Sequence, residues 1–497
     1  MFGSSAPANV TFDVAAADDG TEIFLINGNF ELVAKGIGRA TFSAPPGLYK
    51  LKVRSGNTTV EEVIGVREGM KPIALQPVQL VSPVPLANTA TTLPSHEAAV
   101  RDAVAHPVDV DAGSGSGIVI VVRLSKQGPQ PDAPPQNPAR GLKLLAMDGR
   151  RVADVESEAT IGGDAAQPIA ALHVTVAPGA YRLSLTRADD RRVEQIVVAS
   201  PGWQTQIFMF VDRSGRADVI NAAMTIRKDF QTADETLRLE QIAFGAFRDD
   251  RKILSDQMRA RVADPAAPPM LALLGALLLI REAKTAKEEV ENSGGKGERV
   301  DNRAAVTAIV ANLRTALAPD SHPDVEAIAL GAGNPNPAYP FQSPPMFRAA
   351  WRLLLKASAS DQKLIAPSSF AARIATRLWG DGPWLLYFDP DDAEADERVS
   401  PWHGGALELL ADIAEKTPSA PSARSLFGRV RALFTPRVRR AFPDPRKFDA
   451  VHALAQKTAI DVGKIRAQLD DTKRRQLVKR LGVPMSSIDE WLDGLQK

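Results

Sequence analysis

The sequence predicts a multidomain protein that is β-rich first and helical afterwards: two tandem β-sandwich modules followed by a large all-helical region. Three observations predict this architecture. Residues 9–80 form short alternating runs separated by turn residues, a related pattern returns further along the chain, and the apolar period changes from two to 3.6 near Thr232. Because a chain of 497 residues is too long for one hydrophobic core, several domains are expected.

The first module is predicted from alternation within a single strand. Between positions 49 and 54, tyrosine, leucine and valine alternate with lysine and arginine. In an extended strand successive side chains point to opposite faces, so this stretch has one apolar and one charged face. The pattern is typical of a half-buried strand in an antiparallel sheet.

An internal duplication is predicted because residues 178–185 repeat the pattern of residues 46–53. Both stretches begin with Pro-Gly-x-Tyr and continue with alternating apolar residues, at a shift of 132 positions that takes Gly47 to Gly179. A polar hairpin follows the strand in both copies. We therefore expect the two modules to share one topology.

Turn signals upstream of these strands support the duplication. Asn27-Gly28 in the first copy is matched with Asp148-Gly149 in the second. Both pairs suit a type I′ hairpin, whose two central residues need positive φ. The copy is therefore expected to keep the turn chemistry as well as the strand pattern.

The Pro-Gly-x-Tyr strand followed by a polar hairpin resembles the prealbumin-like family, which includes carboxypeptidase-regulatory-like and PEGA-like modules. The resemblance covers about the first 215 residues and implies a fold rather than an activity. It also implies a role as a stalk or docking module. Tyr49 and Tyr181 are expected to be core residues that bridge two sheets, with ligand contact as the alternative.

Breaks in composition predict the domain organisation. Residues 113–117 alternate glycine with serine and lead into a strand, so they indicate a flexible linker rather than a phosphate loop, which would open a helix. The predicted segments are a first β-sandwich module at 1–84, a linker with a short helix at 85–116, a second β-sandwich module at 117–215, a helical domain at 216–420 and a small C-terminal helical module at 421–497.

The helical region is predicted to begin with a capping box formed by Thr232 and Glu235. Its most apolar run, residues 270–280, would span about 16 Å as a helix, roughly half of a bilayer core, and is expected to be a buried core helix. A Pro-Pro-Met start at Pro268 recurs at Pro344, which leaves a helical solenoid as an alternative. These proline starts with a following tryptophan resemble segments of bacterial proteins linked with peptidase systems.

The candidate site is the segment from Trp379 to His403, where aromatic residues flank an acidic run. Tryptophan and tyrosine beside charged residues are typical of a protein-binding hot spot. The alternative is that the aromatics belong to the core and the acids to a solvated loop. The side chains proposed to contact a partner protein are Trp379, Trp384, Tyr387, Trp402 and His403.

No set of residues has the spacing of a catalytic, metal or cofactor site. The six histidines lack metal-binding spacing, cysteine is absent, the acids at 389–397 lack the glycine and glutamate of a calcium loop, and Gly294-Gly295-Lys296 lacks the P-loop hydroxyl. A formal charge of +1 gives no overall attraction to nucleic acid, and the basic stretch 424–447 is interpreted as a packed helix. We therefore expect no catalytic residue, no metal and no cofactor.

These patterns favour a nonenzymatic adaptor or regulatory protein that binds a partner protein, within a bacterial peptidase-linked system. The alternatives are a surface-associated carbohydrate or cell-wall binding protein, a protease substrate or effector, and a hydrolase that uses His403 as its general base. The first residues lack the basic start and apolar stretch of a secretory signal, so a cytoplasmic location is expected. The oligomeric state is not fixed by any of these patterns.

Overall fold

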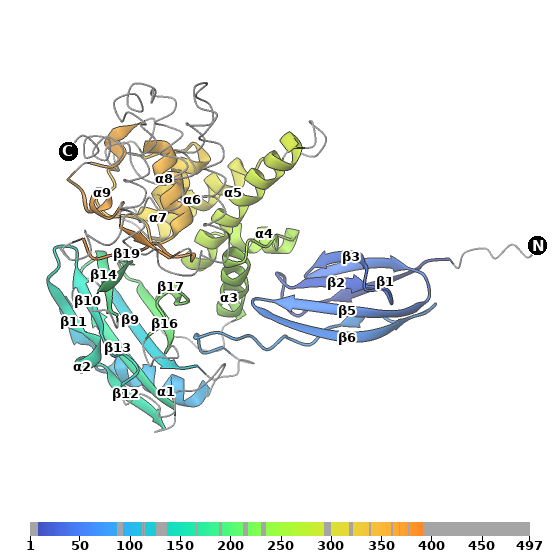
Figure 1. The fold of residues 1–497 in the computed structure, drawn as a ribbon, viewed down its shortest axis with the longest axis horizontal. Helices are drawn as coiled ribbons and strands as arrows, with labels where there is room; N and C mark the ends of the chain where they lie inside the picture. Colours follow the sequence, from blue (N-terminus) through green and yellow to red (C-terminus); the bar gives the residue numbers. More distant parts are fainter. Residues whose placement is uncertain are drawn as a thin grey trace, which may run out of the picture. The chain divides into compact units, whose positions relative to one another are not determined.

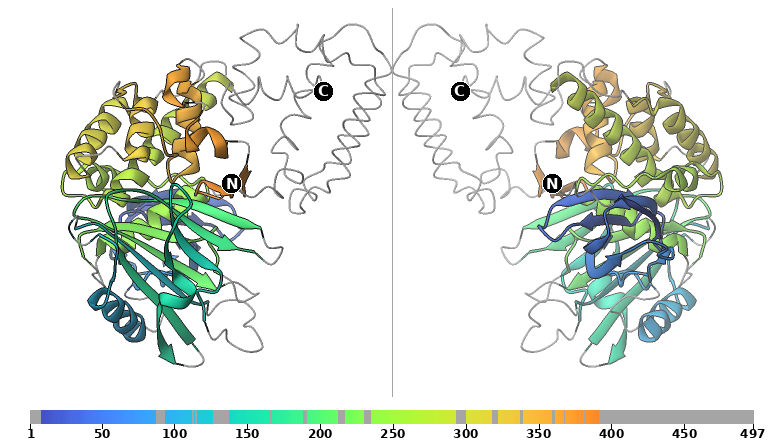
Figure 2. Two further views of the ribbon diagram at one scale, coloured as in Figure 1. Left: turned by 90° about the vertical axis from the view of Figure 1, so that its left-hand side faces the viewer. Right: turned by 90° about the vertical axis from the view of Figure 1, so that its right-hand side faces the viewer.

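The computed structural model contains two compact units. Figures 1 and 2 show the helices and strands in ribbon form. The first holds the residues up to 185 with 195–336 and 382–384, and the second holds 186–194, 337–381 and the described residues from 385 onward. The predicted C-terminal module at 421–497 lies outside the described residues. The structure describes residues 8–86, 93–111, 113, 115–125, 137–164, 167–187, 191–211, 217–229, 235–292, 300–317, 322–336, 339–358, 361–366, 368–375, 377–380 and 382–390.

One seven-stranded sheet forms the N-terminal module of the first unit. The chain turns back between β3 and β4, where Gly38 has a φ of +64° and only Ile37 and Arg39 pair across the two strands. The two halves of the sheet, β6-β5-β2-β3 and β4-β1-β7, enclose one core that includes Phe12 and Leu51. The strands are β1 (Val10–Ala15), β2 (Glu22–Ile26), β3 (Leu32–Ile37), β4 (Arg39–Ala44), β5 (Gly47–Ser55), β6 (Thr58–Val66) and β7 (Ile73–Ala74).

A second β-module follows, and all of it except residues 186–194 lies in the same unit. One sheet has the order β12-β13-β9-β16-β17, with β8 paired to β13, and the other contains β11-β10-β14-β15. Two short helices, α1 (Leu93–Ala105) and α2 (Val155–Glu158), belong to this part of the chain. The strands are β8 (Val108–Asp109), β9 (Gly117–Leu124), β10 (Leu142–Ala146), β11 (Arg151–Asp154), β12 (Thr160–Asp164), β13 (Gln167–Thr175), β14 (Gly179–Thr186), β15 (Arg192–Ala199), β16 (Gln204–Val211) and β17 (Ala223–Arg227).

The two modules share strand order and strand direction, which confirms the predicted duplication at the level of topology. β1 pairs antiparallel with β4 and parallel with β7, and β9 pairs antiparallel with β13 and parallel with β16. The order β2-β5-β6 is repeated as β10-β14-β15. The Tyr49 hydroxyl donates to the Pro45 carbonyl at 2.9 Å, and the Tyr181 hydroxyl donates to the Ala177 carbonyl at 2.8 Å. Each tyrosine therefore closes the turn that leads into its own strand.

Helices make up the rest of the first unit. The apolar run predicted to be a core helix lies in α5, and every large side chain from Met270 to Leu279 is buried, as expected. Within the described residues, no helix is both long and apolar enough to cross a membrane. The first helix of this part of the chain, α3, begins at Glu235, the predicted capping glutamate, whereas Thr232 lies outside the described residues. The helices are α3 (Glu235–Arg248), α4 (Asp256–Ala263), α5 (Pro269–Asn292), α6 (Arg303–Ala316) and α7 (Pro323–Ala332).

The region after residue 216 is not all-helical, which corrects the prediction. β17 pairs with β16 and belongs to a sheet of the second module. In the second unit, β18 (Leu378–Trp379) pairs antiparallel with β19 (Leu386–Phe388), beside α8 (Arg348–Ser358) and α9 (Phe370–Ile374) in sequence. The Asp389 amide donates to the Arg192 carbonyl at 3.0 Å, next to the start of β15. Strands of two or three residues are too short to leave a period-two pattern, so the sequence did not reveal them.

A buried carboxylate joins the first module to the helices of its unit. Glu22 on β2 is fully buried and accepts hydrogen bonds from Arg54 at 2.7 Å, Lys35 at 2.8 Å and Arg251 at 2.7 Å. Burial alone would raise the pKa of Glu22, but hydrogen bonds from these three cations outweigh it and lower the pKa to about 2. Since Arg251 follows α3 in the chain, this carboxylate fixes one end of the sheet to the helical part.

Replacing Glu22 with glutamine is expected to destabilise the first module by roughly 3 kcal/mol at neutral pH, because three cations lose their shared carboxylate. The folded pKa lies below the ordinary value of 4.5, so the wild-type contribution is complete above that value and is lost as the pH falls toward 2. Urea unfolding of both proteins across this range, followed through hydrogen exchange in β2 and β5, measures the difference. A difference independent of pH would contradict the assignment. Glu61→Gln, at an exposed carboxylate, is the matched control.

Alanine at Gly275 is expected to destabilise α5, although this change usually stabilises a helix by about 1 kcal/mol. A Cβ at Gly275 would lie 2.4 Å from the Cβ of Val262 on α4, and such overpacking costs roughly 1–3 kcal/mol. Urea unfolding of Gly275→Ala, Val262→Ala and the double variant tests this contact. The double variant should be more stable than the sum of the two single changes predicts. Additive losses would show that the two positions do not touch.

Candidate functional site

Exposed hydrophobic side chains concentrate in the first module. Of the eight large hydrophobic residues exposed in the described part of the chain, six lie here. Phe30 is 80% exposed, Leu48 73% and Val63 68%. Single exposed hydrophobic residues are normal on a protein surface, whereas a group of them on one face indicates an interaction site. The remaining five are Leu32, Val33, Val60, Val110 and Ile161.

Strand register brings several of these side chains onto one face of the sheet, near the hairpin between β2 and β3. Lys50 on β5 pairs with Val63 on one side and with Ile26 on the other, and Ile26 pairs with Leu32. These four residues form one row across the sheet. Leu48, two positions before Lys50, points to the same face. The name hairpin-end patch is used below for Phe30, Leu32, Leu48, Lys50 and Val63.

Phe30 lies at the tip of this hairpin in a left-handed conformation, with a φ of +63°. The Phe30 amide donates to the Asn27 carbonyl and the Asn27 amide donates to the Glu31 carbonyl, both at 3.0 Å. This is the pattern of a type I turn followed by a bulge. The Asn27 Oδ1 atom also accepts from the amides of Asn29 and Glu31. The loop is therefore held by its backbone and by Asn27, while the phenylalanine ring lies 5.4 Å from the Lys50 Nζ atom.

The duplicated hairpin of the second module has glycine at the position of Phe30. The Gly149 amide donates to the Ala146 carbonyl at 3.0 Å, and the φ of Gly149 is +86°. Both hairpins have a register shift at the equivalent place, after Leu25 in one and after Leu144 in the other. The two turns therefore have the same geometry and differ in the side chain at the strained position.

This equivalence corrects the predicted alignment of the two turns. Asn27-Gly28 was matched with Asp148-Gly149, but the residue of positive φ in the first hairpin is Phe30, two positions after Gly28. The Asn-Gly pair correctly marked a hairpin, whereas its type is a bulged turn in which the asparagine side chain closes the loop.

Charged side chains border the hairpin-end patch. The Lys50 Nζ atom lies 2.9 Å from Glu61 and the Lys52 Nζ atom lies 4.0 Å from it. The hydrogen bond from Lys50 lowers the pKa of the Glu61 carboxyl. The cation within the patch is therefore neutralised by a neighbour.

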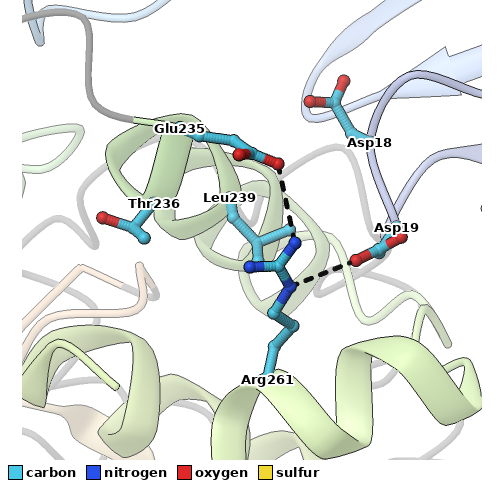
Figure 3. A pocket seen from close by; sticks show the side chains of 6 residues that line it. All are labelled: Asp18, Asp19, Glu235, Thr236, Leu239 and Arg261. Atoms are coloured by element: carbon cyan, nitrogen blue, oxygen red, sulfur yellow. Dashed lines mark ion pairs between the residues drawn. The ribbon is translucent and has the colours of Figure 1, made fainter. Parts of the chain in front are cut away.

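The hollow drawn in Figure 3 is too small for an organic ligand. Arg261 on α4 reaches between Asp19 and Glu235, at 3.4 Å and 3.6 Å from their carboxylates, while Asp18 accepts two hydrogen bonds from Arg238. The hollow measures about 10 Å³, which is room for about one water molecule. In the described ranges, no group of three or more histidine, aspartate or glutamate residues is arranged to hold a metal ion.

Trp384, one of the predicted contact residues, lies in the interior. Its side chain has no exposed surface, its Nε1 atom donates to the Ala222 carbonyl at 2.7 Å, and its ring stacks on Phe244 at 5.3 Å between centroids. The expectation that Trp384 is accessible to a partner is therefore wrong for this structure. Its truncation would test packing rather than binding.

The other predicted contact residues fall into two groups. Tyr387 has no exposed surface and is likewise inaccessible, whereas Trp379 is half-buried, with the Arg187 guanidinium 5.0 Å from its ring centroid. Outside the described residues lie the last two, Trp402 and His403. Their proposed roles stay predictions.

Sequence reasoning missed the hairpin-end patch, although one signal was present. Positions 50, 52 and 54 form the charged face of the strand, and Leu48 continues that face with an apolar side chain. Leucine on a face that otherwise carries cations is the residue that an alternation analysis could have singled out. The role of Phe30 depends on its backbone conformation, which the sequence does not display.

Comparison with known proteins assigns no family to the chain. No protein-family model matches it, and no curated protein matches its sequence.

Proposed function

We propose that the chain is a nonenzymatic adaptor that binds a partner protein through the hairpin-end patch of its first module. Phe30 is the observation that supports this most, because it combines an exposed ring with a left-handed backbone. A bulky residue in this conformation costs about 1–2 kcal/mol, and an exposed ring gains nothing from burial. The second module forms the same turn with Gly149. A contact with a partner accounts for a phenylalanine that the turn does not require.

The composition of the hairpin-end patch fits a binding hot spot. Phe30, Leu48 and Val63 are each more than two-thirds exposed, and full burial of such a side chain stabilises a complex by about 1.5–3 kcal/mol. The ion pair between Lys50 and Glu61 supplies a polar element beside them. Apolar anchors next to charged neighbours are typical of interfaces in which a few residues carry most of the binding energy.

The resemblances of the sequence support the kind of partner. The β-modules resemble prealbumin-like docking modules, and the helical segments resemble parts of bacterial proteins linked with peptidase systems. We therefore place the partner in such a system. The two-module arrangement gives the second copy a structural role and leaves the first to make the contact.

Phe30→Gly is expected to weaken partner binding about thirtyfold or more, the typical effect of truncating a central hot-spot residue. The same change should leave the first module equally stable or up to about 1 kcal/mol more stable, because glycine relieves the strain of a positive φ. Crosslinking of the tagged full chain in its native host identifies the partner. Calorimetry with the purified partner and urea unfolding then measure the two effects.

The matched control is Ile161→Gly, which also removes an exposed hydrophobic side chain, from β12 of the second module. This variant should retain partner affinity. If Phe30→Gly retains affinity and instead destabilises the full chain, then Phe30 packs against the chain itself and the proposed function is wrong.

A further inference from the structure

We infer that the free edge of β6 receives an extended, positively charged segment of the partner protein as an additional strand. This inference rests on the proposed function and specifies how the partner binds. The hairpin-end patch reaches this edge, because Val63 belongs to β6. A strand added to β6 would therefore lie directly beside Val63, the patch residue on that strand.

β6 has the geometry that strand addition requires. It pairs with β5 through nine residue pairs without a register shift, and it ends the order of its sheet. Residues 59–63 are all exposed. Natural sheets usually protect such an edge with charged side chains, proline or a bulge. Residues 58–66 contain no proline, no lysine and no bulge, and their only charged residues are Glu61 and Glu62. Strand addition of a peptide uses an exposed edge of this kind.

The other sheet edges that the structure describes are less suitable. β7 and β18 have two residues each, and β11 has four. β17 has five residues, four of them buried, and packs against α3 and α5. β12 has five residues and packs against α1. β6, with nine residues, is therefore the longest open edge among them.

In the second module, the equivalent edge is paired with another strand. Its copy of β6 is β15, and β19 lies next to β15 in the order of the sheet. The contact is made in the second unit, where the Asp389 amide donates to the Arg192 carbonyl at 3.0 Å. The chain therefore covers this edge with an extended segment in one copy, and the equivalent edge of the other copy has no such strand among the described residues.

The charge on β6 favours a cationic occupant over a second copy of the chain. Glu61 is neutralised by Lys50 and Lys52, whereas no ion pair reaches Glu62 from any residue that the structure describes. Two β6 strands side by side would bring four carboxylates together, and like charges across strands are destabilising. Glu62 and Val63 point to opposite faces of the sheet. A partner strand with lysine or arginine beside Glu62 and an apolar side chain beside Val63 would pair with the first and pack against the second.

A synthetic peptide tests the inference on the full chain. The probe is a labelled nine-residue peptide in which valine alternates with lysine or threonine. Binding should slow hydrogen exchange in β6, as measured by mass spectrometry. N-methylation of the peptide amides that face β6 should weaken binding about tenfold or more, whereas methylation of the alternate amides should not, since only one set pairs with the edge.

A charge reversal provides the matched comparison. Glu62→Lys should weaken binding of the same peptide about tenfold, and Glu97→Lys on α1 should not change it. Unprotected β6 amides at saturating peptide, or equal binding of both methylated forms, would overturn strand addition. If strand addition fails these tests but Phe30→Gly still loses partner binding, the proposed function stands and only strand addition is wrong. A concentration-dependent dimer in sedimentation, with hydrogen exchange in β6 slowed in the dimer, would show instead that a second copy occupies the edge.

Discussion

The buried carboxylate of Glu22 determines which part of the first module stays free. It lies on the same face of the sheet as Lys50, and it gathers cations from β3, β5 and the segment after α3. A buried carboxylate is stable only when its oxygens are paired, so the helices must approach this end of the sheet. The other end of the same face carries the hairpin-end patch. One end of this face is thus attached to the helices, and the other end is exposed.

The two copies of the β-module differ in how much of their sheets is covered. In the second module β9 is buried along all eight residues, and β17 extends its sheet. In the first module β6 is exposed over most of its length. One topology therefore yields two different surfaces, because the segments that flank each copy differ. The two copies also differ at the left-handed position of the equivalent hairpin turn, which is Phe30 in the first module and Gly149 in the second.

Much of the fold could be predicted from local patterns, and most of the candidate site could not. Alternation in residues 49–54 reflects burial of one face of a strand, and the apolar run at 270–280 reflects a helix segment buried on every face, so both patterns identified β5 and α5 correctly. Trp384 was misplaced because aromatic residues are equally typical of cores and of hot spots, and only tertiary packing separates the two. No local pattern reveals the burial of Glu22, because its partner Arg251 is 229 residues away in the sequence.

Phe30 links the backbone to the proposed function. Strain at a turn persists when the surrounding structure fixes the conformation more firmly than the strain opposes it. Here the side chain of Asn27 and the bulge fix the turn independently of residue 30, so the fold tolerates any side chain there at a cost of about 1–2 kcal/mol. Residue 30 is therefore available for binding, because the turn does not depend on its side chain. The exposed ring, 5.4 Å from the Lys50 Nζ atom, supports the proposed contact with a partner.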